Sequence, residues 1–142
     1  MKEADLSVIP LFADMPRAQL QQLNGLAHQR TYQAGEHVFR QGEDGIGVFV
    51  VTSGEFELIH ELPNGESQVE TTVGPGAVLG LTSMLDEGPR RASARALTPA
   101  SCMVLTRITF RQAIAANPAI AIDIMQGMAR NLREVSALLD RD

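Results

Sequence analysis

The chain lacks the features of several large protein classes. It has a single cysteine among its 142 residues, so it cannot form an internal disulfide, and we expect a reducing, cytoplasmic location. No apolar run approaches the roughly 18–20 residues that a membrane span needs, and the N-terminus has neither the basic start nor the apolar stretch of a signal peptide. The net charge of −5 argues against non-specific nucleic-acid binding by this segment alone. We therefore expect one globular domain without a membrane partner.

Sequence signatures of catalysis are absent as well. His28, His37 and His60 show no metal-binding spacing, and no His-x-His pair occurs. The chain has no Gly-x-Ser-x-Gly motif, Walker-type phosphate loop or dinucleotide-binding loop. We therefore expect a protein that is not an enzyme and has no metal or cofactor.

The middle of the chain is rich in glycine and in short runs of β-branched and aromatic residues. Ten of the twelve glycines lie between Gly35 and Gly88, and Leu62-Pro63-Asn64-Gly65 is typical of a tight hairpin turn. The runs predict short strands at regular spacing, which is the pattern of a sandwich or jelly roll. They cover 36–39, 48–51, 55–59, 68–73, 92–97 and 102–106.

Helical patterns flank the β region. Asp14 and Pro16 predict the start of an N-terminal helix, and Asn117-Pro118 ends a short helix predicted over 109–116. A long helix is predicted over 119–139. The fold class is therefore α+β. We expect a single domain over 1–142, made of N-terminal helices (1–30), a jelly-roll β-roll, or double-stranded β-helix (31–107), and two C-terminal helices (108–142).

The last predicted helix carries a regular apolar seam. Its members recur at spacings of four and three, as two paired helices require, and Ile120, Ile124 and Leu138 widen the apolar surface. We favour a homodimer through this seam, with the other side of the helix covering the β-roll. The alternative is a helix that packs wholly on its own domain. The seam consists of Ala121, Met125, Met128, Leu132, Val135 and Leu139.

Charge is unevenly distributed along the chain. Residues 35–88 hold ten acids against one arginine, whereas residues 89–117 hold five arginines and no acid. The basic stretch either serves a small anion or simply neutralises the acids beside it, and charge alone favours neutralisation. The five arginines are Arg90, Arg91, Arg95, Arg107 and Arg111.

One stretch combines small residues with arginine. From Gly80 to Ser83 we expect backbone N–H groups to approach a ligand and a short helix to begin, whose N-terminus favours anions. An arginine a few residues later grips phosphate oxygens through two parallel hydrogen bonds. The alternative is a β-turn beside an unrelated surface charge.

Several motifs together resemble the cyclic nucleotide-binding domains, and in particular the cAMP receptor protein branch (Crp/Fnr regulators). The stretch 74–93 resembles the phosphate-binding cassette of that family, and 42–54 is similar to its β-roll signature. The resemblance covers nearly the whole chain and implies a β-roll with a long dimerising C-terminal helix. The other matching segments are 9–12, 32–36, 110–112, 117–118 and 128–132.

The resemblance also implies roles for individual residues. In the family a cassette glutamate binds the ribose 2′-hydroxyl, and Leu81 stands at that position here. Arg90 matches the phosphate-binding arginine when the motif 89–93 sets the register, whereas counting from the preceding glycine selects Arg91. On the C-terminal helix, Ser136 keeps one half of a polar pair that contacts the base. The implied ligand-binding residues are Gly80, Leu81, Thr82, Ser83, Arg90, Arg91, Ser93 and Ser136.

We accordingly expect a sensory module that binds cAMP, cGMP or another phosphate-bearing, nucleotide-like molecule and signals through its helix dimer. Losing the glutamate removes about 1.5–3 kcal/mol, more than tenfold in affinity, so we expect weak cAMP binding, a different ligand or none. The alternative is a degenerate domain without ligand, acting as a dimerisation or interaction module or as the sensor part of a transcription regulator. We also expect Arg90→Ala to abolish binding while leaving thermal stability nearly unchanged.

Overall fold

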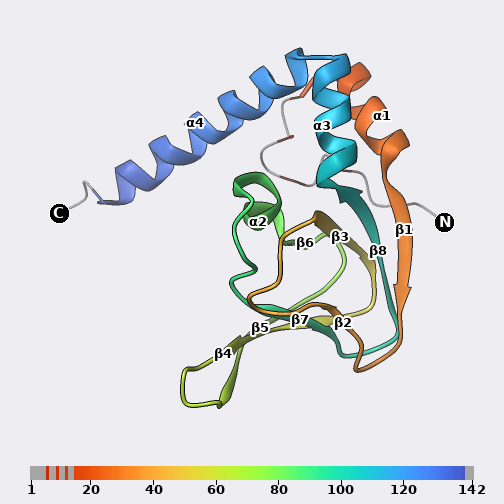
Figure 1. The fold of residues 1–142 in the computed structure, drawn as a ribbon. Helices are drawn as coiled ribbons and strands as arrows, with labels where there is room; N and C mark the ends of the chain where they lie inside the picture. The colour runs from red at the N-terminus through yellow and green to blue at the C-terminus, as the bar shows by residue number, and fades with distance from the viewer. Residues whose placement is uncertain (1–5, 7–8, 10–11, 13–14, 140–142) are drawn as a thin grey trace.

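In the computed structural model, two four-stranded antiparallel sheets lie beneath a cap of helices (Figure 1). The structure describes Leu6, Ile9, Phe12 and residues 15–139, without the side chains of 131 and 134–139. The elements are α1 (Arg17–Leu26), β1 (His28–Tyr32), β2 (His37–Phe39), β3 (Gly47–Ser53), β4 (Phe56–Glu61), β5 (Ser67–Val73), β6 (Val78–Leu79), α2 (Leu81–Asp86), β7 (Ser93–Ala96), β8 (Ala100–Thr106), α3 (Arg107–Ala116) and α4 (Ala119–Leu139).

The two sheets have the strand orders β1-β8-β3-β6 and β2-β7-β4-β5. Each sheet thus combines strands from the beginning and the end of the β region, as a jelly roll does. Every predicted run is a strand, and Asn64-Gly65 forms the turn between β4 and β5, with Gly65 in the left-handed region at φ 89°. The predicted α+β jelly roll is confirmed.

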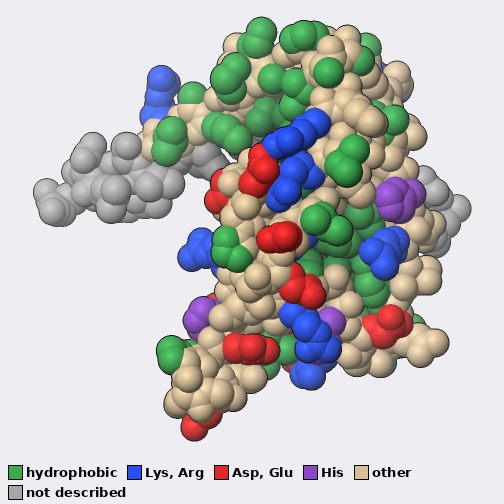
Figure 2. Space-filling model, in the orientation of Figure 1, with side chains coloured by type: hydrophobic (Ala, Val, Ile, Leu, Met, Phe, Trp, Pro, Cys, Tyr) green, Lys and Arg blue, Asp and Glu red, His purple; other side chains and the backbone are tan. Residues whose placement is uncertain are grey.

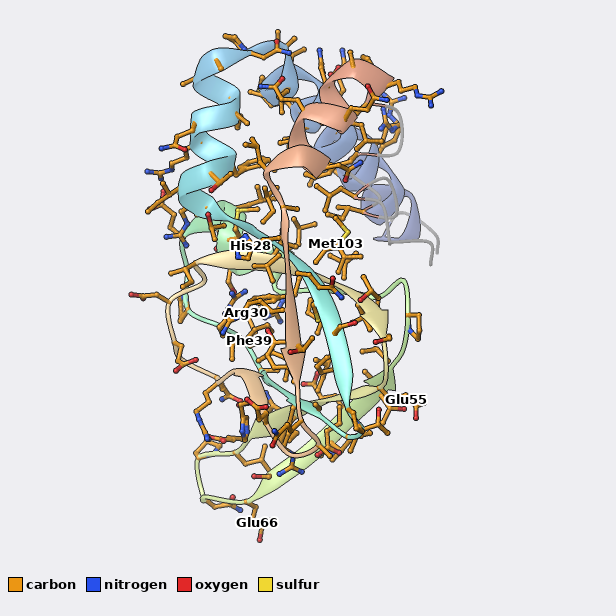
Figure 3. All side chains as sticks on the ribbon, turned by 90° about the vertical axis from the view of Figure 1, so that its right-hand side faces the viewer. His28, Arg30, Phe39, Glu55, Glu66 and Met103 are labelled. Atoms are coloured by element: carbon orange, nitrogen blue, oxygen red, sulfur yellow. The ribbon has the colours of Figure 1, made fainter. Side chains whose placement is uncertain are left out.

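Two strands have no counterpart among the predicted runs. β6 is a two-residue strand, and β1 begins at His28, inside the stretch 1–30 that we expected to be helical. β1 is an edge strand whose first four residues are exposed. Figure 3 shows His28 and Arg30 along this edge. Because polar residues occupy both of its faces, the strand lacks the apolar alternation that predicts a strand.

β3 is buried on both faces. Val48 and Val50 pack into the core beneath the helices, whereas Phe49 and Val51 pack into the core between the two sheets. Successive side chains of a strand point to opposite faces, so a strand inserted between two cores is apolar at every position. This explains the unbroken apolar run at 48–51.

The helices begin close to the predicted positions. Pro16 is the N-cap of α1 and makes no side-chain capping bond, and the predicted cap, Asp14, lies outside the described residues. α3 begins slightly earlier than predicted because the Thr106 hydroxyl accepts a hydrogen bond from the Thr109 amide at 3.2 Å. That contact satisfies one of the free N–H groups of the first turn.

α4 has the predicted bounds, and its described side chains divide between two faces. Ile120 and Ile124 are buried in the core beneath the helices, whereas Met125 and Leu132 are 58% and 68% exposed. The helix runs away from the sheets (Figure 1), and hydrophobic side chains gather on the helical cap (Figure 2). The side chains of two predicted seam members, Val135 and Leu139, lie outside those described. Among the described residues, no helix is long and apolar enough to cross a membrane.

Candidate functional site

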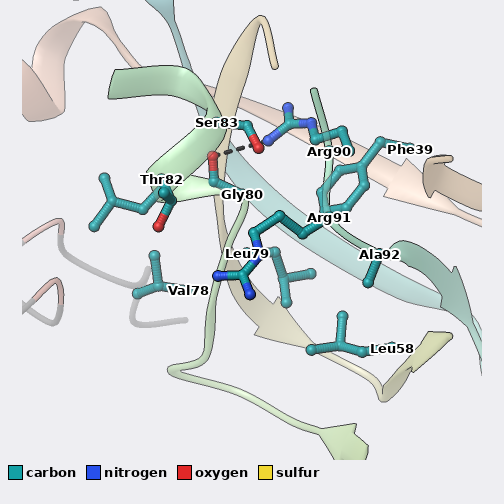
Figure 4. A pocket seen from close by; sticks show the side chains of 11 residues that line it. Phe39, Leu58, Val78, Leu79, Gly80, Thr82, Ser83, Arg90, Arg91 and Ala92 are labelled. Atoms are coloured by element: carbon teal, nitrogen blue, oxygen red, sulfur yellow. Dashed lines mark hydrogen bonds between the residues drawn. The ribbon is translucent and has the colours of Figure 1, made fainter. Parts of the chain in front are cut away.

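A pocket with a volume of about 230 Å³ opens beside the start of α2 (Figure 4). Its walls come from the β6–α2 segment, the residues before β7, and single side chains of β2 and β4. The structure brings six of the predicted site residues together here: Gly80, Leu81, Thr82, Ser83, Arg90 and Arg91. The other lining residues were not among the predicted site residues: Val78, Leu79 and Ala92 lie within the stretch 74–93, whereas Phe39 and Leu58 lie outside it.

Gly80 connects β6 to α2 in a conformation that other residues rarely adopt. Its φ is +79°, in the left-handed region, which glycine enters without a steric penalty. A side chain here would also collide with its neighbour, because a Cβ would overlap Nη1 of Arg90. The glycine is therefore required by the position of the arginine as well as by the turn. The helix that follows has only six residues, so its dipole contributes little, and the arginines supply the positive charge.

Arg90 is built into the protein interior. Its side chain is only 2% exposed, and its two terminal nitrogens donate to the carbonyls of Gly80 and Gly47, each at 2.8 Å. The guanidinium carbon lies 4.2 Å from the centre of the Phe39 ring. Burial, assisted by the charge of Arg107, lowers the pKa of Arg90. The expectation that Arg90→Ala is neutral for stability does not fit this geometry, since the change would leave two carbonyls without donors.

Arg91 has a different environment, although it follows directly in the chain. It is exposed and lines the pocket. Within the described part of the chain it forms no hydrogen bond or ion pair. In the view of Figure 4, its guanidinium lies among Thr82, Val78 and Leu79, whereas that of Arg90 points towards Gly80.

The remaining arginines of the basic stretch are held by the protein itself. Arg95 forms an ion pair with Glu57 across β7 and β4, and Arg111 forms one with Glu87. Neutralisation of neighbouring acids therefore explains these two arginines. It does not explain Arg91.

Three predicted site residues have defined local contacts. Leu81 is half-buried, lines the pocket and packs against the core beneath the helices. The Ser83 hydroxyl donates to the carbonyl of Pro89 at 3.1 Å. The Ser93 hydroxyl accepts from the amide of Gln41 at 2.8 Å, and Ser93 is not among the lining residues. The side chain of Ser136 lies outside those described.

Arg107 connects the pocket to the C-terminal helices, a role that no sequence motif indicated. It is the first residue of α3, and its guanidinium donates to the carbonyls of Met84 at 3.0 Å and Ser83 at 3.1 Å. It also donates to the carbonyl of Gly45. The arginine therefore joins α2, which carries pocket residues, to the helix that leads into α4.

The sequence is similar to those of known regulatory proteins. Residues 29–117 match the family model described as "Cyclic nucleotide-binding domain". The cyclic AMP receptor protein of Thermus thermophilus is 31% identical over 131 residues, which are 92% of this chain and 61% of that protein. The CRP-like cAMP-activated global transcriptional regulator of Mycobacterium tuberculosis is 31% identical over 102 residues, which are 72% of this chain and 46% of that protein.

The fold is also similar to that of a solved structure. The N-terminal domain of a transcriptional regulator from Streptomyces coelicolor A3(2) is similar with a TM-score of 0.84 and 28% identity. The similarity covers 94% of this chain and 92% of that domain. By contrast, the chain spans only about half to three-fifths of the length of the two curated relatives.

Proposed function

This chain belongs to the CRP/Fnr-type cyclic nucleotide-binding domains, and we propose on that premise that it senses a small anionic molecule without catalysing a reaction. The family supports a ligand-sensing regulatory role. The observation that carries the proposal is the pocket, where the cassette residues 80–83 meet two arginines around one cavity. A phosphate-bearing, nucleotide-like molecule, such as cAMP or cGMP, is the candidate that the family suggests.

The route of signalling is part of the proposal. Ligand contact at the start of α2 acts on a helix whose carbonyls are bound by Arg107 of α3. α3 leads through Asn117-Pro118 into α4, so a shift of α2 reorients the C-terminal helix. A ligand that prefers one position of α2 then shifts an existing equilibrium between helix arrangements.

The readout that we propose is a homodimer through α4. Ile122, Met125, Met128 and Leu132 leave an apolar strip exposed along the helix. Val135 and Leu139 continue the same spacing in the sequence. Covering such a strip with a second copy removes apolar surface from water, which is the main driving force of association. In a longer protein, the same helix would carry the signal to a following domain.

The direct test is titration calorimetry of the whole chain with cAMP, cGMP and a small organic phosphate, combined with sedimentation velocity with and without ligand. Saturable binding of at least one of these anions, with a change in sedimentation, is the expected result. The absence of binding by all of them would contradict the proposal.

A second candidate is a dimerisation or interaction module that has no ligand. The observation favouring it is that both terminal nitrogens of Arg90, the family's expected phosphate ligand, already donate to carbonyls of its own chain. Leu81 adds to this by replacing the ribose acceptor. A dimer that forms normally and binds none of the anions would support this candidate.

A further inference from the structure

We propose that Arg91 makes the paired hydrogen bonds to the ligand's charged group, and that the ligand is a small oxyanion on an apolar body rather than a ribose-containing nucleotide. This inference rests on the proposed ligand-binding function of the same pocket and specifies what the pocket accepts. The oxyanion is a phosphate or a carboxylate, because a guanidinium binds both through the same paired hydrogen bonds.

The first argument is the difference in engagement between the two arginines. Arg90 already donates two hydrogen bonds of 2.8 Å to carbonyls and stacks on Phe39. Its Nε is buried and has no hydrogen-bond partner among the residues that the structure describes, so Arg90 keeps a donor for a ligand, although both of its terminal nitrogens are engaged. Arg91 gives up no protein contact within the described residues. Arg91 therefore offers its whole guanidinium to an anion, whereas Arg90 offers only the donors that its two carbonyl bonds leave free.

The second argument is where that charge lies. Arg91 lines the pocket together with Val78 and Leu79, and Figure 4 draws its guanidinium among them. Apolar neighbours exclude water from one side of an ion pair and so strengthen it relative to an exposed pair. An anion that reached this guanidinium would place the rest of its body against the same apolar walls.

The third argument concerns the body of the ligand. No carboxylate lines the pocket in the part of the chain that the structure describes, so a ribose hydroxyl would lack the acceptor that the family glutamate supplies. It would instead face Leu81, and a polar group buried without a partner is unfavourable. The volume of about 230 Å³ is also below the roughly 300–1,000 Å³ of pockets for drug-sized ligands. A compact apolar body fits both observations.

The experiment compares four probes by titration calorimetry on the whole chain: phenyl phosphate, benzoate, inorganic phosphate and cAMP. The variant is Arg91→Gln, which removes the charge from an exposed side chain and so should not disturb folding. The matched control is Arg17→Gln, which removes the same charge from an exposed position on α1, outside the pocket. Circular dichroism melting of both variants confirms that they are folded.

We expect phenyl phosphate or benzoate to bind more tightly than inorganic phosphate and cAMP, and the tighter of the two identifies the preferred oxyanion. Arg91→Gln should weaken that binding at least about tenfold, as the loss of a charge-assisted contact does. Arg17→Gln should leave it unchanged. An equal loss in both variants would indicate non-specific attraction and would overturn the inference.

Other outcomes separate this inference from the proposed function. If cAMP binds most tightly and Arg91→Gln leaves its affinity unchanged, the inference is wrong and the proposed sensing function stands. If neither these probes nor cGMP binds the unmodified chain, both are wrong.

Discussion

The Nε–H group of Arg107 donates to the carbonyl of Met84 at 3.0 Å, and so joins the first residue of α3 to α2. Carbonyls near the end of a helix lack partners within it, and an arginine supplies donors with a favourable charge. The second bond of this arginine to α2, to the Ser83 carbonyl at 3.1 Å, makes the connection a clamp rather than a single contact.

The first prediction tests this clamp. Arg107→Ala removes charge-assisted hydrogen bonds to carbonyls that are partly buried, so the free energy of unfolding should fall by about 2–3 kcal/mol, measured by urea denaturation. The control is Arg111→Ala, which breaks an ion pair whose side chains are 61% and 51% exposed and should cost less than about 1 kcal/mol. Equal effects of the two changes would show that Arg107 is not a clamp.

The second prediction concerns Arg90 and the glycine beside it. Arg90→Ala should lower the free energy of unfolding by about 2–4 kcal/mol, because a buried cation and its bonds to two carbonyls are lost. Arg91→Ala should change it by less than about 0.5 kcal/mol, as expected for an exposed position. Denaturation of both variants in urea distinguishes the interior arginine from the exposed one.

Gly80→Ala should destabilise the protein as well, since its Cβ would collide with Arg90. In the double variant with Arg90→Ala, the collision with the arginine no longer exists, and what remains is the strain of the left-handed backbone and a close approach to the carbonyl of Gly47. The losses in the free energy of unfolding of the two single variants should therefore add up to more than the loss in the double variant. Strict additivity would contradict the packing of Gly80 on Arg90.

The third prediction concerns Leu81, which stands where the family has the glutamate that accepts a hydrogen bond from the ribose. If the pocket otherwise keeps the family geometry, Leu81→Glu should strengthen cAMP binding about tenfold or more, with a much smaller gain for 2′-deoxy-cAMP. The free variant should be less stable, because Leu81 packs against the core beneath the helices and a carboxylate there is partly desolvated. Titration calorimetry with both nucleotides checks this, and equal gains would mean that position 81 does not meet the ribose.

The fourth prediction concerns the exposed strip of α4. Leu132→Asp should yield monomers, since a charge would be buried at the dimer seam. Leu132 is 68% exposed within one chain, so the monomer itself should fold normally. Ile108→Asp is the control, because Ile108 is 71% exposed on α3 and not on the seam. In sedimentation experiments Leu132→Asp should be a monomer and Ile108→Asp a dimer. An unmodified chain that is monomeric at high micromolar concentration would exclude the dimer.

The fifth prediction is a pH effect at Cys102. Burial raises the pKa of this thiol from 9.0 to about 12, so the folded state favours the neutral thiol. Its contribution to stability is complete below pH 9 and is lost as the pH rises towards 12, because the unfolded chain ionises first. Cys102→Ala should therefore reduce the loss of stability at alkaline pH, which pH-dependent urea denaturation measures. Native protein should react with iodoacetamide at pH 8 only as fast as it unfolds.

The strands were predictable where local pattern and burial agree, and unpredictable where tertiary contacts decide. The alternation at 55–58 predicts that Glu57 faces solvent, yet Glu57 is only 7% exposed. Its cross-strand partner Arg95, which is distant in the sequence, covers it and neutralises its charge. A period-two pattern reports which face a residue occupies, but not what packs over that face.

At the pocket, too, the sequence pattern does not reveal which tertiary contacts a residue makes. The motif placed Arg90 and Arg91 at the pocket, and both line it. The inward direction of Arg90 depends on the carbonyl of Gly47, 43 residues away, and on the ring of Phe39. Neither partner belongs to the cassette, so only the assembled sheets decide which of the two arginines turns into the interior and which stays exposed.

The double burial of β3 has a mechanical consequence for the whole domain. One core contains Val48 and Val50, the other Phe49 and Val51, and a single backbone carries all four. Neither core can open while the other keeps this strand in place. The helical cap and the sandwich should therefore exchange their most protected amide hydrogens as one cooperative unit.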